Sequence, residues 1–199
     1  IHKQTAVLIV PKDSKFKNVA DLVAFAKENP GKVTINGAGL YVGHHIATLQ
    51  LQKATGVKMS YIPEKGGTEA IQNVLGGKVM AGFNNLADVY RSQDRLTILA
   101  IADVKRHEYL PDVPTLQELG YNVDDASVNF RGYALPKGVD PSIVDKAAKI
   151  VPVMFHDPEV VKRMKDSGSP MLIMDRAQVL EMFQKKQETL KALLSDLRK

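Results

Sequence analysis

Short runs rich in apolar and β-branched residues alternate along the chain with longer segments whose apolar residues recur every three or four positions. The short runs predict buried strands, and the recurring positions predict helices with one apolar face. Because strands and helices alternate from end to end, the pattern predicts an α/β fold with largely parallel sheets. Strands are predicted at residues 7–10, 33–35, 57–62, 79–83, 96–101, 130–135 and 171–174. Helices are predicted at residues 19–28, 43–55, 68–75, 87–92, 141–155, 158–167 and from 176 onward.

Capping residues mark where several of these helices begin. Asn18 precedes the first helix, and the pairs Asp140-Pro141 and Asp157-Pro158 each combine an N-cap with proline at the first helical position. Thr115 and Glu118 have the spacing of a capping box, which predicts a short helix ending at Gly120. Asp175 caps a long last helix, whose apolar side is predicted to be Val179, Phe183, Leu190, Leu194 and Leu197.

Two glycine-rich loops each follow a predicted strand and precede a predicted helix. The first spans Gly37 to Gly43, and the second is Lys65-Gly66-Gly67-Thr68. Free backbone N–H groups at a helix N-terminus carry partial positive charge and attract anions. In an open α/β sheet such loops lie at the carboxyl ends of the strands, where ligands bind. The chain is therefore predicted to be organised around a pair of anion-attracting loops.

The first loop has three interpretations. It resembles a dinucleotide fingerprint, since G-x-G-x-x-x-G follows a strand and Glu64 stands about 20 residues later. It also fits a small-carboxylate site built from backbone N–H groups, or a tight turn that only needs glycine. The second loop favours the carboxylate interpretation, because a two-loop clamp uses it and a dinucleotide domain does not. The proposed donors are the backbone N–H groups of Gly39, Leu40, Tyr41, Val42 and Gly43.

In the second loop, Gly66 and Gly67 allow the backbone to approach a ligand, and Thr68 adds a hydroxyl. Lys65 would contribute a favourable field rather than a fixed contact. Asn84 and Asn85 end a predicted strand at the same sheet edge and could donate amides to a ligand, although asparagine also suits an ordinary turn.

Composition excludes several other classes of function. The 199 residues are 44% hydrophobic and 25% charged, as in ordinary globular proteins. The net charge is +5, but the lysines are scattered and tryptophan is absent, so nucleic-acid binding is not favoured. The absence of cysteine excludes thiol catalysis and zinc–thiolate sites. No apolar run approaches the roughly 20 residues that span a bilayer, so direct membrane insertion is not predicted.

Catalytic and metal-binding motifs are likewise not predicted. His44 and His45 are adjacent, so on a helix they point about 100° apart and cannot easily hold one ion. A packing or hydrogen-bonding role at the helix start is favoured instead. The chain has no G-x-S-x-G motif and no evident nucleophile–base pair. We therefore expect a protein that is not an enzyme and needs no cofactor.

Several motifs resemble the substrate-binding receptors of the tripartite tricarboxylate transporter family, also called Bug receptors. Residues 110–120 are similar to the family pattern LPDVPTxxExG, which is the most specific match. Residues 26–45 match a pattern that runs from NPGK through the first glycine loop to a histidine, and residues 63–70 match PYKGxxxA. Residues 132–138 are similar to the family's return strand, and the resemblance covers nearly the whole chain.

The resemblance implies a type II periplasmic-binding-protein-like fold, with two lobes that close on a small organic carboxylate. It implies that residues 11–128 form the second lobe and that residues 1–10 and 129–199 belong to the first lobe, which would be incomplete because the family's N-terminal part is missing. The paired strand ends Val10-Pro11-Lys12 and Leu135-Pro136-Lys137 are consistent with two crossings between lobes. The resemblance further implies a periplasmic location and membrane transporter subunits as partners.

Three positions depart from the family pattern. The family's serine before the helix is Val42, its tyrosine in the second loop is Glu64, and its frequent aspartate after the third strand is Asn84. These departures alter the side chains around the pocket but leave the backbone donors in place. A solute-binding receptor is therefore the leading hypothesis, and the alternative is a Rossmann-like NAD-binding oxidoreductase domain with Glu64 on a ribose.

Overall fold

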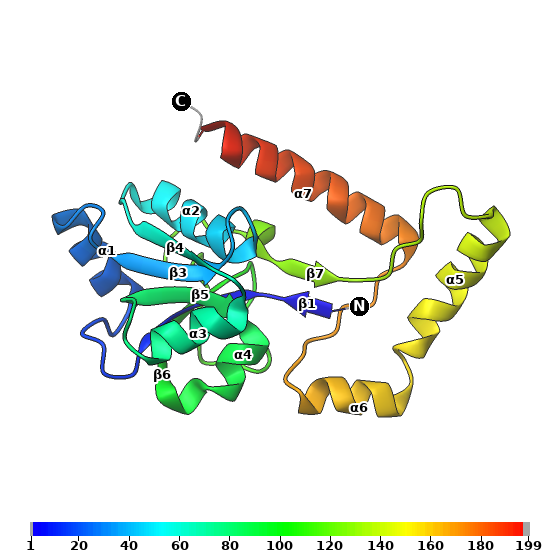
Figure 1. Ribbon diagram of the computed structural model, residues 1–199, viewed down its shortest axis with the longest axis horizontal. Coiled ribbons are helices and arrows are strands. Elements are labelled where there is room, and N and C mark those ends of the chain that lie inside the picture. The colour runs from blue at the N-terminus through cyan, green and yellow to red at the C-terminus, as the bar shows by residue number, and fades with distance from the viewer. Residues whose placement is uncertain (1, 197–199) are drawn as a thin grey trace. The chain divides into compact units, whose positions relative to one another are not determined.

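The computed structural model describes residues 2–196 and divides into two compact units (Figure 1). The larger unit comprises Gln4–Asn129, and the smaller comprises the described parts of residues 1–3 and 130–199. Residues 4–10 therefore group with the larger unit, whereas the sequence assigned residues 1–10 to the other lobe. Leu197, predicted on the apolar side of the last helix, lies outside the described residues.

The larger unit is built on a five-stranded sheet with the strand order β4-β3-β5-β2-β6. Its strands are β2 (Ala6–Pro11), β3 (Thr34–Ala38), β4 (Ser60–Glu64), β5 (Ala81–Asn85) and β6 (Leu96–Ala102). β3 pairs in parallel with β4 and β5, while β2 pairs antiparallel with both β5 and β6. The prediction of a largely parallel sheet is confirmed for every strand but β2, which runs against the other four.

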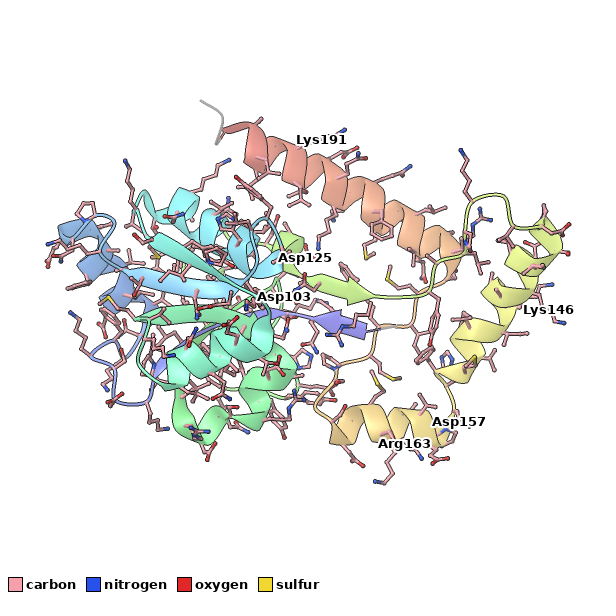
Figure 2. All side chains as sticks on the ribbon, in the orientation of Figure 1. Asp103, Asp125, Lys146, Asp157, Arg163 and Lys191 are labelled. Atoms are coloured by element: carbon pink, nitrogen blue, oxygen red, sulfur yellow. The ribbon has the colours of Figure 1, made fainter. Side chains whose placement is uncertain are left out.

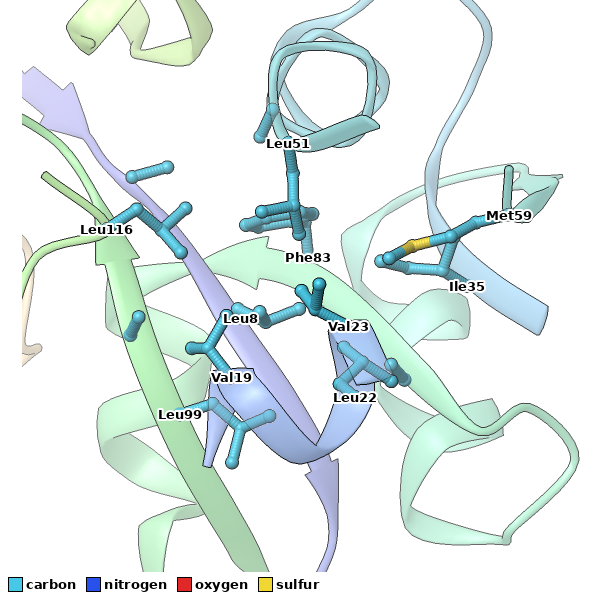
Figure 3. Packing of buried hydrophobic residues seen from close by; sticks show 14 of the residues in the cluster. Leu8, Val19, Leu22, Val23, Ile35, Leu51, Met59, Phe83, Leu99 and Leu116 are labelled. Carbon is cyan, nitrogen blue, oxygen red and sulfur yellow. The ribbon is translucent and has the colours of Figure 1, made fainter. Parts of the chain in front are cut away.

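Helices cover both faces of this sheet. They are α1 (Val19–Glu28), α2 (Gly43–Thr55), α3 (Gly67–Leu75) and α4 (Leu86–Arg91), with short 3₁₀ turns at Gln93–Arg95 and Asp125–Ser127. The predicted bounds of α1 and α2 are confirmed. β2 is buried on both sides, as expected of a central strand between two helical layers. Its alternate residues enter two cores, so that Leu8 packs with α1 and α2, and Val7 packs with α3 and α4. Figure 3 shows Leu8, Val19 and Phe83 of the first core together.

The N-cap of α1 stabilises the start of this helix through side-chain hydrogen bonds. Asn18 Oδ1 accepts a hydrogen bond from Asp21 N at 2.9 Å, and Asp21 Oδ2 accepts one from Lys17 N at 2.8 Å. Replacing Asn18 with alanine leaves a helix N–H without its side-chain partner, so we expect the free energy of unfolding to fall by about 1 kcal/mol. Urea denaturation followed by circular dichroism measures this. The exposed Asn122, replaced by alanine, is the control, and an equal loss in both variants would contradict the cap's contribution.

Two predicted elements are wrong and a third is shortened. Thr115 N donates to Glu118 Oε2 at 2.7 Å and Glu118 N donates to Thr115 Oγ1 at 3.1 Å, so the capping box forms. However, Gly120 adopts φ +85° immediately afterwards, which leaves a turn and no helix. Residues 171–174, predicted as a strand, belong to no strand of the described chain. The strand predicted at 130–135 is confined to β7 (Asn129–Arg131), which pairs with β1 (His2–Gln4).

The smaller unit contains α5 (Pro141–Met154), α6 (Pro158–Asp166) and α7 (Arg176–Asp196). Its predicted caps are confirmed, because Asp140, Asp157 and Asp175 each accept a hydrogen bond from a backbone N–H in the first helical turn. No residue of α5 or α6 is buried, and charged side chains such as Arg163 and Lys191 project outward from α6 and α7 (Figure 2). The two hydrophobic cores that the structure describes both belong to the larger unit.

Candidate functional site

The predicted site residues gather at the carboxyl ends of β3, β4 and β5. We call residues 39–43, 65–68 and 84–85 the loop cluster. Gly39 N donates to Glu64 O at 2.8 Å, which joins the end of β3 to the end of β4. Asn84 Nδ2 donates to Gly67 O at 2.8 Å, which joins the end of β5 to the second loop. The parallel strands β3, β4 and β5 thus bring the three predicted segments to one edge of the sheet.

The first loop turns sharply through two residues with positive φ. Gly39 has φ +56°, which costs glycine little, whereas Tyr41 has φ +57°. The left-handed conformation costs a residue with a Cβ atom about 1–2 kcal/mol. Two hydrogen bonds hold this shape, since Tyr41 N donates to His45 Nδ1 at 3.0 Å and the Tyr61 hydroxyl donates to Gly39 O at 3.0 Å. The loop is therefore shaped by its own helix and by the neighbouring strand.

The two histidines are hydrogen-bonded supports of this loop. His44 is 1% exposed, and its Nδ1 accepts from Ala38 N at 3.0 Å while its Nε2 lies 3.1 Å from Asn85 Oδ1. Because Nδ1 accepts, the proton of the neutral ring is assigned to Nε2, which donates to Asn85. The His45 ring stacks on Tyr61 with centroids 4.2 Å apart. The structure thus gives both residues the hydrogen-bonding role at the helix start that their positions predict.

Burial disfavours the protonated form of both rings. Desolvation lowers the pKa of His44 and of His45 below the usual 6.5. For His44 the hydrogen bond with Asn85 and the nearby Asp88 carboxylate oppose this effect, but burial is the larger cause. Within residues 2–196, no three His, Asp or Glu side chains gather so as to hold a metal ion.

The N-termini of α2 and α3 lack side-chain caps. The N-cap of α2 is Val42 and that of α3 is Gly66, and neither helix start receives a side-chain hydrogen bond from its cap. In contrast, α1 is capped by Asn18. The first N–H groups of a helix need an acceptor from outside its own ladder. Both helix starts in the loop cluster therefore offer backbone donors. The first turn of α2 holds no acidic residue, whereas Glu69 in the first turn of α3 accepts from Lys65 N at 2.9 Å and offsets part of the positive charge there.

The site residues differ in their accessibility. Leu40, Tyr41, Val42, Lys65 and Thr68 are exposed, and Gly39, Gly66, Gly67 and Asn85 are partly exposed. Gly43 is buried against the segment that contains Ser127 and Asn129. Asn84 is also buried, and both ends of its amide are engaged, since its Oδ1 accepts from Asn85 N at 2.8 Å. Asn84 therefore shapes the cluster, whereas Asn85 lies at its surface.

Three residues beside the loop cluster were not predicted as site residues, because they belong to none of the predicted motifs. Tyr61 and Asn129 contact the first loop because the fold brings distant segments together, whereas Asp88 contacts Asn85 of its own segment. Asp88 Oδ2 accepts from Asn85 Nδ2 at 3.3 Å, and Asp88 also pairs with Arg91. The only sequence signal for Asp88 is its position three residues after Asn85 at the start of a helix.

The geometry does not favour the dinucleotide interpretation. Glu64 Oε1 accepts hydrogen bonds from Asn36 Nδ2 at 3.2 Å and from Asn73 Nδ2 at 2.8 Å, so the acid expected on a ribose is bound to two amides. In addition, the antiparallel β2 lies inside the sheet, whereas a dinucleotide-binding fold has parallel strands in the order 3-2-1-4-5-6.

Comparison with known proteins shows that this α/β fold is that of periplasmic binding proteins. The sequence model described as "Tripartite tricarboxylate transporter family receptor" matches residues 1–198. The chain belongs to this family, and the predicted family and fold class are confirmed.

Individual relatives extend the comparison. The chain is 40% identical over 140 residues to a Cupriavidus necator protein called "UPF0065 protein in gbd 5'region". This alignment covers 70% of this chain and 42% of the relative. It is 32% identical over 169 residues to Protein BugT of Bordetella pertussis, covering 84% of this chain and 52% of BugT. The chain thus spans about half the length of these curated relatives.

Solved structures share the fold at low identity. An R. palustris protein, Rpa4515, whose structure holds adipate, has a TM-score of 0.87 and 19% identity, covering 98% of this chain and 66% of that one. A ligand-free TctC solute-binding protein from Polaromonas has a TM-score of 0.79 and 23% identity, covering 98% of this chain and 67% of that one. Among residues 2–196, no helix combines the length and the apolar character that crossing a membrane requires.

Proposed function

We propose that this chain belongs to a periplasmic receptor that captures a small organic carboxylate and delivers it to the membrane subunits of a tripartite tricarboxylate-type transporter. The observation that carries the proposal is the pair of uncapped helix N-termini, at Val42 and Gly66, held at one edge of the sheet. A carboxylate supplies the acceptor oxygens that these N–H groups lack. Family membership and the adipate-bound R. palustris neighbour, which shares the fold, support a carboxylate ligand.

Each part of the loop cluster has a role in this proposal. Of the predicted first-loop donors, Gly39 N and Tyr41 N are already bound to Glu64 O and His45 Nδ1, so the N–H groups of Leu40, Val42 and Gly43 remain for the carboxylate. Those of Gly66–Thr68 hold it from the second loop, the Thr68 hydroxyl and the Asn85 amide add hydrogen bonds, and Lys65 contributes positive field. The larger unit corresponds to the ligand-binding second lobe assigned to residues 11–128, and the smaller unit corresponds to part of the first lobe. The receptor binds without catalysis, which agrees with a family named for receptors.

Isothermal titration of the receptor, in the length its gene encodes, tests the proposal. The panel contains adipate, malate, citrate and NAD. Binding of one carboxylate in the micromolar range, without a signal for NAD, is the expected result. Binding of NAD with no response to any carboxylate would overturn the receptor proposal and favour the oxidoreductase alternative.

Replacing Thr68 with valine tests one contact. Thr68 is exposed at the start of α3, and valine keeps its shape while removing the hydroxyl. We expect carboxylate binding to weaken by about 1 kcal/mol, or roughly five-fold in Kd. The same titration measures this, with Thr55 replaced by valine as the control at the far end of α2. Unchanged affinity in the Thr68 variant would remove its hydroxyl from the site.

A further inference from the structure

Three consecutive apolar side chains are exposed on the first loop. Leu40 is 57% exposed, Tyr41 is 64% exposed and Val42 is 43% exposed. Residues 4–129 are all described, and they expose only three other large hydrophobic side chains, which are scattered at Tyr90, Val104 and Leu119. We call residues 40–42 the apolar rim. A contiguous exposed apolar segment, in contrast to single exposed residues, marks a binding surface.

The apolar rim is continuous with the proposed carboxylate donors. Its own backbone lies between the end of β3 and the first turn of α2, whose N-cap is Val42. Gly39 N donates to Glu64 O, and Tyr41 N donates to His45 Nδ1, so two rim-side donors are fixed within the protein. A ligand carboxylate at the remaining helix-start donors therefore places the atoms next to it against the three apolar side chains.

The apolar rim provides no cation and few hydrogen-bond donors for a second charged group of the ligand. Residues 39–43 include no lysine, arginine, serine or threonine, and the Tyr41 hydroxyl is their only side-chain hydrogen-bond donor. Both ring nitrogens of His44 and Nδ1 of His45 already have hydrogen-bond partners in the protein. A charged group lying over the rim would lose water without gaining a cation or a set of donors, which is unfavourable.

We propose that the ligand is a carboxylate with an apolar body, such as an alkyl or aromatic monocarboxylate, whose carboxylate meets the helix starts and whose hydrocarbon part packs on Leu40, Tyr41 and Val42. This inference rests on the proposed function, since it names the ligand class of that site. It predicts that the receptor binds a monocarboxylate more tightly than a dicarboxylate of the same chain length.

The pair hexanoate and adipate tests the inference in the gene-length receptor, because the two six-carbon ligands differ only at the far end. We expect hexanoate to bind at least about ten-fold more tightly than adipate, because the second carboxylate of adipate loses water over the rim without gaining a partner. Adipate binding as tightly as hexanoate, or more tightly, would overturn the apolar ligand class and leave carboxylate capture standing. A receptor that binds neither these ligands nor malate or citrate would overturn the proposed function itself.

A double variant, Leu40→Asn with Tyr41→Asn, tests the role of the rim. Asparagine tolerates the left-handed conformation at position 41, and both side chains are exposed, so the fold is retained. We expect hexanoate affinity to fall by about ten-fold and adipate affinity to change by less than about two-fold. Leu119→Asn, at another exposed leucine, is the matched control and should change neither. An equal loss for both ligands would overturn the inference, since the rim would then contact protein and not the ligand body.

Discussion

Replacing Gly43 with alanine is expected to destabilise the larger unit by about 2–3 kcal/mol, as overpacking of a buried position does. A methyl group at this position would overlap the backbone carbonyl oxygen of Ser127 and would lie 2.7 Å from Asn129 Oδ1. The carbonyl belongs to the main chain, so it cannot rotate away as a flexible side chain could. The first turn of α2 must therefore separate from the segment 127–129. Since this turn carries the first-loop donors, carboxylate affinity should fall as well.

Gly66→Ala is the matched control, because Gly66 also stands at the start of a helix in the loop cluster. A Cβ atom there would meet nothing within 4 Å, and its φ of −176° is open to any residue. We expect its free energy of unfolding to change by less than about 1 kcal/mol, the scale of an N-cap substitution. Urea denaturation of both variants measures the difference. A Gly43 variant as stable as the Gly66 variant would contradict the packing of residues 127–129 on α2.

The elements predicted best are those whose signals are local. The bounds of α1 follow from Asn18 and from apolar residues at helical spacing, and α2 ends where Gly56 adopts φ +70°. The strand predicted at 171–174 fails because an apolar run shows only that a segment can be buried. Whether it pairs depends on a neighbouring strand, and the described structure provides none.

The direction of β2 could not be predicted from its own residues. Its continuous apolar pattern shows that both faces are buried, which holds for a parallel or an antiparallel strand between two helical layers. Antiparallel pairing with β5 and β6 depends on how the chain enters the unit. Local pattern thus predicts burial, and topology decides orientation.

In the loop cluster, too, the sequence predicts some features and only the folded structure shows the others. Parallel strands predict that Gly39, Gly66 and Asn85 share one edge, and the structure places them there. Tyr61, which supports the first loop, is not visible as a partner in sequence, because its hydroxyl binds Gly39 O across 22 residues of chain that no motif spans. The burial of Asn84 likewise depends on Gly67 of a different segment. Which groups can face a ligand therefore becomes clear only in the folded chain.

Acidification below pH 6.5 is expected to destabilise the larger unit through His44 and His45. Burial lowers the pKa of both rings, so the folded state binds fewer protons than the unfolded state in the range between the lowered values and 6.5. Stability is thus complete above pH 6.5 and falls as the pH drops toward the lowered values. The slope is at most about 1.4 kcal/mol per pH unit for His44 alone. Asp88 and Asn85, which face His44, oppose the lowering of its pKa but do not outweigh burial. The rings that contact His45 are those of Tyr41 and Tyr61.

The structural cause of this acid sensitivity is the loop itself. Protonation places a hydrogen on Nδ1, where His44 and His45 now accept from Ala38 N and Tyr41 N. Each ring must then give up its loop contact. Urea denaturation between pH 7.5 and pH 5, above the range where carboxylates titrate, measures the effect. The double variant His44→Gln with His45→Gln should be less stable at pH 7.5 but lose less on acidification, while His156→Gln, at an exposed site beyond α5, should follow the unmodified protein. Equal acid sensitivity in all three proteins would show that these two histidines do not couple the first loop to protonation.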